Sequence, residues 1–111
     1  MGAYRAGYWL LPDVRAARRA LRGRRFDAIL ADDIDTVPLA LSLGAPGGVH
    51  ADLHEYFPRL HEEHEPWRRR IGPWYAWLCR RYLPRAASVT TVAPSIADEY
   101  SRTFGVHVEV A

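Results

Sequence analysis

Apolar and polar residues alternate with two different periods along the first half of the chain. Residues 13–23 place apolar side chains at helical spacing opposite a run of arginines, which predicts an amphipathic helix. The apolar run FDAILA, residues 26–31, is typical of a strand buried on both faces. A second helix is predicted over 35–44, where Pro38 fits only the first turn, and a second strand over 49–53.

The second half repeats this order and begins with an aromatic helix. Tryptophans, tyrosines and aliphatic residues recur at helical spacing over 66–83, which predicts a helix that breaks at the Gly-Pro pair 72–73. The β-branched residues over 87–93 predict a strand. A further helix is predicted over 94–105 and a last strand over 106–110.

Helices and strands in alternation favour an α/β fold. We therefore predict one domain, residues 1–111, with a Rossmann-like parallel sheet that carries helices on both faces. Ser95 precedes Asp98 by three residues, which predicts a capping box at the start of the last helix. Ligands of such sheets bind beyond the carboxyl ends of the strands, where residues 32–33 and 52–55 follow two of the predicted strands.

Composition narrows the functional classes. The chain has 111 residues, a net charge of +2 and a single cysteine, Cys79, so we expect a cytoplasmic protein without disulfides and without a nucleic-acid partner. No stretch is long and apolar enough to predict a membrane span or a secretory signal.

Arginines supply all the basic residues of the chain, and several of them share one side of the first predicted helix. The simplest interpretation is a solvated helix face. The alternative is peripheral contact with an anionic membrane, which basic amphipathic helices can make. The arginines concerned are Arg15, Arg18, Arg19 and Arg22.

Histidines and carboxylates crowd the stretch HADLHEYFPRLHEEHE, residues 50–65. Zinc sites on helices use two histidines four residues apart on one face. His50 and His54 have that separation, but an intervening strand would place them about 13 Å apart. His61 and His64 are three residues apart. We therefore predict no metal and no cofactor, and keep a small metal-dependent hydrolase built on these histidines as an alternative.

Three segments in the order FDAILADDIDTVPLAL, HADLHEYFP and ASVTTVAPSIADEYSRTFGV resemble the N-terminal half of retaining GT-B glycosyltransferases, of the group 1, subfamily 4-like type. The similarity extends over roughly residues 10–110. It implies a Rossmann-like domain that binds a sugar acceptor and faces a second domain holding a nucleotide-sugar donor. In that family the sugar is transferred with retention of configuration, usually without a bound metal.

The resemblance also implies roles for single residues. His54 matches the family histidine that faces the reacting sugar, and it is the predicted catalytic residue. Its neighbours in the chain would orient it or shape the acceptor pocket, two earlier aspartates match an acceptor-side loop, and a serine matches the small residue that opens the later helix. These substrate-binding residues are Asp52, Glu55, Asp32, Asp33 and Ser95.

The chain also departs from the family pattern. Members of the family begin with a strand and a Gly-rich loop and carry a donor-binding second domain, and this sequence contains none of these parts. We therefore expect an incomplete half of a glycosyltransferase that is inactive alone. The non-enzyme alternative is an interaction module that forms a homodimer through its aromatic helix, and association without sugar binding would favour it.

Overall fold

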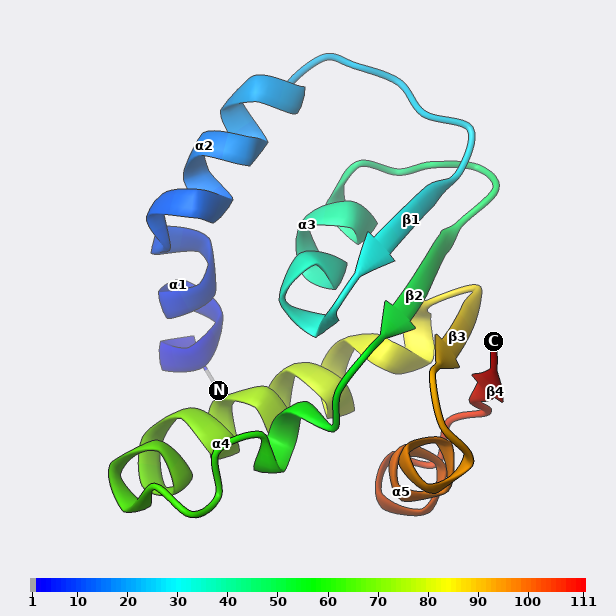
Figure 1. Ribbon diagram of the computed structural model, residues 1–111. Coiled ribbons are helices and arrows are strands. Elements are labelled where there is room, and N and C mark those ends of the chain that lie inside the picture. Colours follow the sequence, from blue (N-terminus) through cyan, green and yellow to red (C-terminus); the bar gives the residue numbers. More distant parts are fainter. Residues whose placement is uncertain (1) are drawn as a thin grey trace.

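The sheet at the centre of the molecule is parallel throughout. The computed structural model describes residues 2–111 and contains a four-stranded sheet in the order β1-β2-β3-β4 (Figure 1). The strands are β1 (Ile29–Asp32), β2 (Val49–Leu53), β3 (Ser88–Thr91) and β4 (Glu109–Val110). Each neighbouring pair runs parallel, so the predicted α/β class with a parallel sheet is confirmed.

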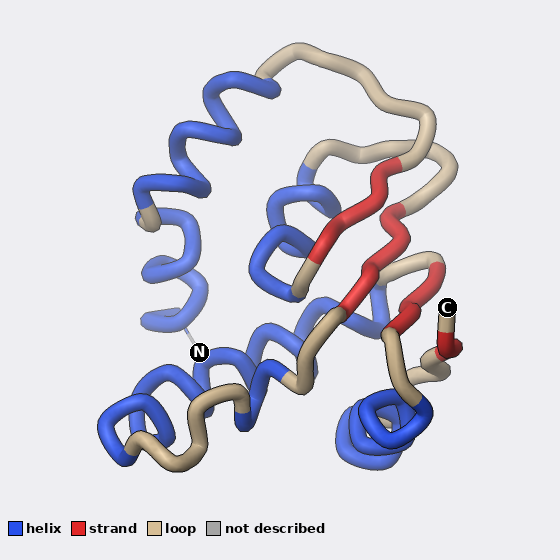
Figure 2. The backbone as a smooth tube through the Cα atoms, in the orientation of Figure 1, coloured by secondary structure: helices blue, strands red, loops and turns tan. Residues whose placement is uncertain are grey.

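Helices connect successive strands, because a parallel neighbour can be reached only by a crossover that returns the chain to the same end of the sheet (Figure 2). These helices are α3 (Val37–Ser42), α4 (Glu65–Tyr82) and α5 (Pro94–Phe104). Short 3-10 turns accompany them at η1 (Ile34–Thr36), η2 (Phe57–Arg59) and η3 (Leu83–Arg85). The carboxyl ends of the strands consequently share one edge of the sheet.

Within residues 2–111, helices cover one face of the sheet. In β2, Val49 and Leu53 are buried, whereas His50 and Asp52 point to the opposite face and are half-buried. On β1, Leu30 is 68% exposed. The sequence predicts helices on both faces, whereas within residues 2–111 the face of His50 and Asp52 is left open.

Two helices precede the sheet, α1 (Gly2–Leu10) and α2 (Pro12–Leu21). The sequence pattern predicted α2 but not α1. Tyr8 of α1 is only 1% exposed, and its hydroxyl donates a hydrogen bond to the Asp35 carbonyl at 2.7 Å. The same hydroxyl accepts a bond from the Leu39 N–H at 3.2 Å, and burial raises the pKa of Tyr8 to about 12. These bonds fasten α1 to the start of α3.

The first helix also covers part of the aromatic side of α4. The rings of Tyr8 and Trp74 stack with centroids 6.5 Å apart, and those of Tyr4 and Trp77 pack at 5.6 Å. The aromatic surface on which the homodimer alternative depended is therefore partly occupied from within the chain.

Helix α4 runs unbroken through Gly72 and Pro73, so the predicted break is wrong. Gly72 is buried, and a Cβ at this position would lie 3.1 Å from the Pro58 carbonyl oxygen and 3.3 Å from the Trp67 ring. The helix is therefore packed closely against the preceding turn at the position where proline removes a backbone donor. Tertiary packing outweighs the local preference of the Gly-Pro pair.

The capping of α5 and the start of β1 also differ from the prediction. The expected capping box at Ser95 is wrong, because Ala93 is the cap residue of α5, Pro94 occupies its first turn and no side-chain cap bond forms. Strand β1 begins at Ile29 instead of residue 26. Before it, the Asp27 carbonyl accepts a hydrogen bond from the Gly47 N–H, which belongs to the loop between α3 and β2.

Replacing Tyr8 with phenylalanine removes a hydroxyl that both donates and accepts a hydrogen bond. We expect Tyr8→Phe to lower the free energy of unfolding by about 1–3 kcal/mol, because the Asp35 carbonyl and the Leu39 N–H lose their partner at a site shielded from solvent. Urea denaturation followed by circular dichroism measures this loss. Tyr4→Phe is the matched control, since Tyr4 also packs on α4 but forms no hydroxyl hydrogen bond within residues 2–111. Equal losses in the two variants would contradict the assignment.

Candidate functional site

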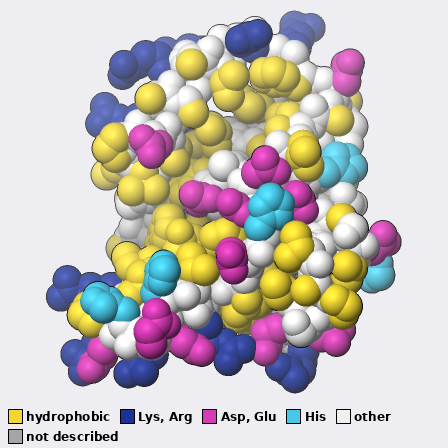
Figure 3. All heavy atoms as spheres, in the orientation of Figure 1, with side chains coloured by type: hydrophobic (Ala, Val, Ile, Leu, Met, Phe, Trp, Pro, Cys, Tyr) yellow, Lys and Arg dark blue, Asp and Glu magenta, His cyan; other side chains and the backbone are white. Residues whose placement is uncertain are grey.

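Acidic side chains and a histidine gather at the carboxyl ends of β1 and β2 (Figure 3). Asp32 and Asp52 are partners at the last position where these two strands pair. The Asp33 N–H donates to the Asp52 carbonyl at 2.8 Å, which extends the contact one residue beyond β1. His54 follows Asp52 by two residues. We call Asp32, Asp33, Asp52 and His54 the strand-end cluster.

His54 is held by Asp52. The imidazole Nε2 lies 3.0 Å from the Asp52 Oδ2, with 53% of the histidine side chain and 25% of the aspartate side chain exposed. Because an ionised carboxylate can only accept, Nε2 is the nitrogen that carries the hydrogen in this contact. Of the two neighbouring carboxylates that the resemblance brings near His54, Asp52 is the one that contacts the ring.

The pKa of His54 is raised above its ordinary value. The hydrogen bond to Asp52 is the largest cause, the negative charge of Asp52 comes next, desolvation opposes both, and the charges of Asp33 and Asp32 add to the increase. Since the folded-state pKa exceeds the unfolded value, the stabilisation from this pair is fully present below the unfolded pKa. It is lost as the pH rises through the folded-state pKa.

Thr90 of β3 belongs to the same cluster of contacts, although the sequence analysis did not select it. Its hydroxyl donates to the Asp52 Oδ1 at 2.8 Å, while Oδ2 faces His54. Thr90 and Asp52 are register partners, so their side chains project from the same face of the sheet. The contact between Thr90 and Asp52 could not be predicted, because it requires the register between β2 and β3, which depends on tertiary packing.

Asp33 has an unusual backbone, with φ 71° and ψ 156°. This region is essentially restricted to glycine, and holding another residue there costs of the order of 1–3 kcal/mol. The Asp33 N–H donates to the Asp52 carbonyl, and the Asp33 Oδ1 lies 3.5 Å from the backbone nitrogen of His54. The Thr36 hydroxyl donates to the Asp32 and Asp33 carbonyls at 2.8 and 2.9 Å. The surrounding bonds thus maintain a strained turn that carries a carboxylate into the cluster.

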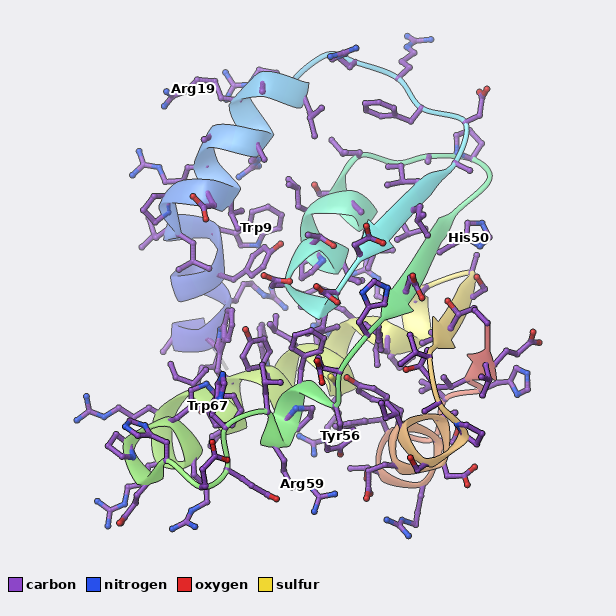
Figure 4. All side chains as sticks on the ribbon, in the orientation of Figure 1. Trp9, Arg19, His50, Tyr56, Arg59 and Trp67 are labelled. Atoms are coloured by element: carbon purple, nitrogen blue, oxygen red, sulfur yellow. The ribbon has the colours of Figure 1, made fainter. Side chains whose placement is uncertain are left out.

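Glu55 and Ser95, also predicted as substrate-binding residues, lie outside these contacts. The Glu55 side chain is exposed and forms no hydrogen bond within residues 2–111, although its carbonyl accepts the Tyr100 hydroxyl at 2.5 Å. Ser95 lines a separate groove of about 310 Å³ with Tyr56 and Arg59, which are labelled in Figure 4. The Arg59 guanidinium in this groove is bound to Glu99 of α5 at 2.7 Å.

Three of the four histidines in residues 50–65 have separate side-chain partners. The His50 Nδ1 lies 2.7 Å from the Ser88 hydroxyl, His54 binds Asp52, and the His61 ring packs edge-on against Trp67. No three histidine, cysteine or acidic side chains are placed to share a metal ion anywhere in residues 2–111. The metal-dependent hydrolase considered above therefore lacks a ligand set in this part of the chain.

Apart from His54, the strand-end cluster is negatively charged. Across residues 2–111, no arginine forms an ion pair with its three aspartates. Carboxylates accept hydrogen bonds, and histidine can donate or accept them. The arrangement therefore suits a ligand rich in hydroxyl groups and disfavours a phosphate group next to the aspartates.

A comparison with protein-family models gives a match to Glycosyltransferase Family 4 over residues 1–111. The chain belongs to this family. The resemblance described from the sequence is therefore confirmed, and the glycosyltransferase domain has its acidic side chains and His54 at the carboxyl ends of its parallel strands. The corresponding comparisons with curated proteins and with solved structures gave no match.

The strained turn of this glycosyltransferase domain can be tested by its stability. We expect Asp33→Gly to unfold with a free energy about 1–2 kcal/mol higher than Asp33→Ala, because both variants lose the carboxylate but only glycine adopts the observed backbone without strain. Urea denaturation of both variants measures the difference. Equal stabilities, or a more stable alanine variant, would show that the turn is unstrained.

Proposed function

We propose that this domain binds the sugar acceptor of a retaining glycosyltransferase, with His54 facing the hydroxyl that receives the sugar. The observation that carries the proposal is the His54–Asp52 hydrogen bond at the carboxyl ends of β1 and β2. Open parallel sheets bind their ligands at this edge. The family match supplies the chemical class, the transfer of a sugar.

In this proposal, His54 orients the acceptor hydroxyl through Nδ1, because Nε2 is engaged by Asp52. Protonated His54 donates to the hydroxyl oxygen, and neutral His54 accepts its hydrogen. The acceptor oxygen forms the bond to the anomeric carbon of the donor, while the bond from that carbon to the diphosphate breaks. The diphosphate leaves with the electron pair of this bond and takes up the proton of the acceptor hydroxyl. Asp32 and Asp33 accept hydrogen bonds from neighbouring hydroxyls of the acceptor.

The negative charge of the strand-end cluster determines which chemical group of the acceptor can bind there. We propose a neutral polyhydroxyl group at this position, because uncompensated aspartates repel an anion. The nucleotide-sugar, with its diphosphate, is assigned to a second, donor-binding domain of the GT-B arrangement. Residues 1–111 alone would then bind acceptors without transferring sugar. We propose a cytoplasmic location, since the single cysteine, Cys79, is buried and unpaired.

Acceptor binding is tested directly by saturation-transfer NMR on the chain, with neutral probes such as methyl glucosides, mannose and myo-inositol. We expect His54→Ala and Asp52→Asn each to weaken binding of the best probe about tenfold, the effect of about one lost hydrogen bond to a charged group. A hexose 6-phosphate should compete less well than the neutral hexose at the same concentration.

His107→Ala is the matched control, because His107 is exposed and its side chain contacts Glu109 of the edge strand β4. This variant should bind the probes as the unaltered chain does. The proposal would be contradicted if no neutral probe bound, or if the variants at His54 and Asp52 bound as well as the control.

A second surface lies on α2, and we propose that it makes peripheral contact with an anionic membrane. Arg15, Arg18, Arg19 and Arg22 form, with Trp9, a groove of about 210 Å³, and none of these arginines has an acidic partner within residues 2–111. The Arg18 guanidinium lies 4.9 Å from the Trp9 ring centroid. Arg19 projects outward from α2 (Figure 4). None of the helices in residues 2–111 has the length and apolar character needed to cross a bilayer.

Co-sedimentation with vesicles tests this surface. We expect binding to vesicles containing about one-third phosphatidylserine and little binding to neutral phosphatidylcholine, with Arg19→Gln/Arg22→Gln reducing the affinity about tenfold or more. Arg68→Gln/Arg70→Gln is the matched control, since it removes the same charge from exposed positions of α4. Equal losses in both double variants would show that only net charge matters.

A further inference from the structure

Thr90 holds the carboxylate that in turn holds His54. The Thr90 hydroxyl is 2.8 Å from the Asp52 Oδ1, and the Asp52 Oδ2 is 3.0 Å from the His54 Nε2. The three side chains form a continuous array from β3 across β2 to the loop that follows it. We infer that Thr90 is a positioning residue, which fixes the Asp52 carboxylate so that His54 presents Nδ1 to the acceptor. This inference rests on the acceptor site proposed above.

The geometry explains why a hydroxyl at position 90 is needed. The carboxylate torsion of an aspartate is broad, so a single contact with His54 would leave the Asp52 carboxylate free to rotate. Thr90 engages one oxygen and thereby fixes the direction of the other. Thr90 and Asp52 are register partners, and both are half-buried, so the contact is built into the sheet.

The fixed carboxylate also selects the tautomer of His54. Neutral imidazole carries one hydrogen, and a carboxylate acceptor at Nε2 keeps that hydrogen on Nε2. Nδ1 then has a lone pair and no partner within residues 2–111. A ligand hydroxyl therefore meets an acceptor when His54 is neutral and a donor when it is protonated.

The other charged groups near His54 do not make this selection. Asp33 and Asp32 add negative charge around the ring, and the Asp33 Oδ1 faces the backbone N–H of His54. These charges favour protonation without a hydrogen bond to either ring nitrogen. The choice between Nδ1 and Nε2 therefore depends on Asp52 and, through it, on Thr90.

Long-range ¹H–¹⁵N NMR of the ¹⁵N-histidine-labelled chain reads both the tautomer and the titration of His54. In the unaltered chain we expect the Nε2–H tautomer for neutral His54. In Thr90→Val, which keeps the shape and removes the hydroxyl, we expect a mixture of tautomers and a titration midpoint lowered by about 0.5 pH units or more. Thr90→Ser retains the hydroxyl and should restore the behaviour of the unaltered chain.

Ser88→Ala is the matched control on the same strand and the same face, because the Ser88 hydroxyl contacts His50 instead of Asp52. It should leave the His54 signals unchanged. The inference is overturned if Thr90→Val folds and keeps the tautomer and midpoint of His54. It is also overturned if neutral His54 in the unaltered chain carries its hydrogen on Nδ1, a result that requires no variant to fold.

These measurements need no sugar, so they separate the positioning role from acceptor binding. A Thr90-dependent tautomer together with failure of every neutral probe to bind would refute the proposed function and leave the array intact. Binding that depends on His54 but not on Thr90 would refute the positioning role and leave the proposed function intact.

Discussion

The candidate site depends on the packing of helices against a single face of the sheet. Strand residues alternate between the two faces, so burying Val49 and Leu53 of β2 leaves Asp52 on the open side. The same alternation buries Val89 of β3 and leaves Thr90 beside Asp52. A slip of one residue would bury the aspartate and expose the apolar side chains. The apolar contacts that stabilise the fold therefore also set the direction of the polar groups.

The polar side chains on the open face largely satisfy one another across the strands. His50 pairs with Ser88 on one row and Asp52 with Thr90 on the next, and no buried side-chain nitrogen or oxygen in residues 2–111 lacks a partner. Bonding capacity remains where the strands end, at the half-exposed ring of His54. The groups on this face that can still form hydrogen bonds therefore lie at the edge of the sheet that a ligand can reach. The strained backbone of Asp33 lies at the same edge.

The sequence pattern was sufficient for most of the alternating elements, because these depend on short-range spacing. The family resemblance brought Asp52 and Glu55 together as neighbours that would orient His54, and it did not select between the two carboxylates. Neither could reveal contacts that tertiary packing creates. Helix α1 was missed because its attachment rests on the Tyr8 hydroxyl and two backbone groups far along the chain. The Gly72-Pro73 break was predicted from local propensity, which close packing against Pro58 overrides. Ser95 was placed at the site by resemblance, and the structure sets it in another groove.

The net charge of +2 conceals two surfaces of opposite sign. Aspartates occupy the strand ends, whereas arginines with no acidic partner in residues 2–111 line α2. An anionic surface would attract α2 and repel the strand-end cluster, so electrostatics alone would orient the domain there. An acceptor anchored in such a surface would then have to present a neutral hydroxyl group to His54, away from its own charge. The charge separation thus links the two proposed contacts, since the anionic surface that attracts α2 is repelled by the aspartates of the strand-end cluster.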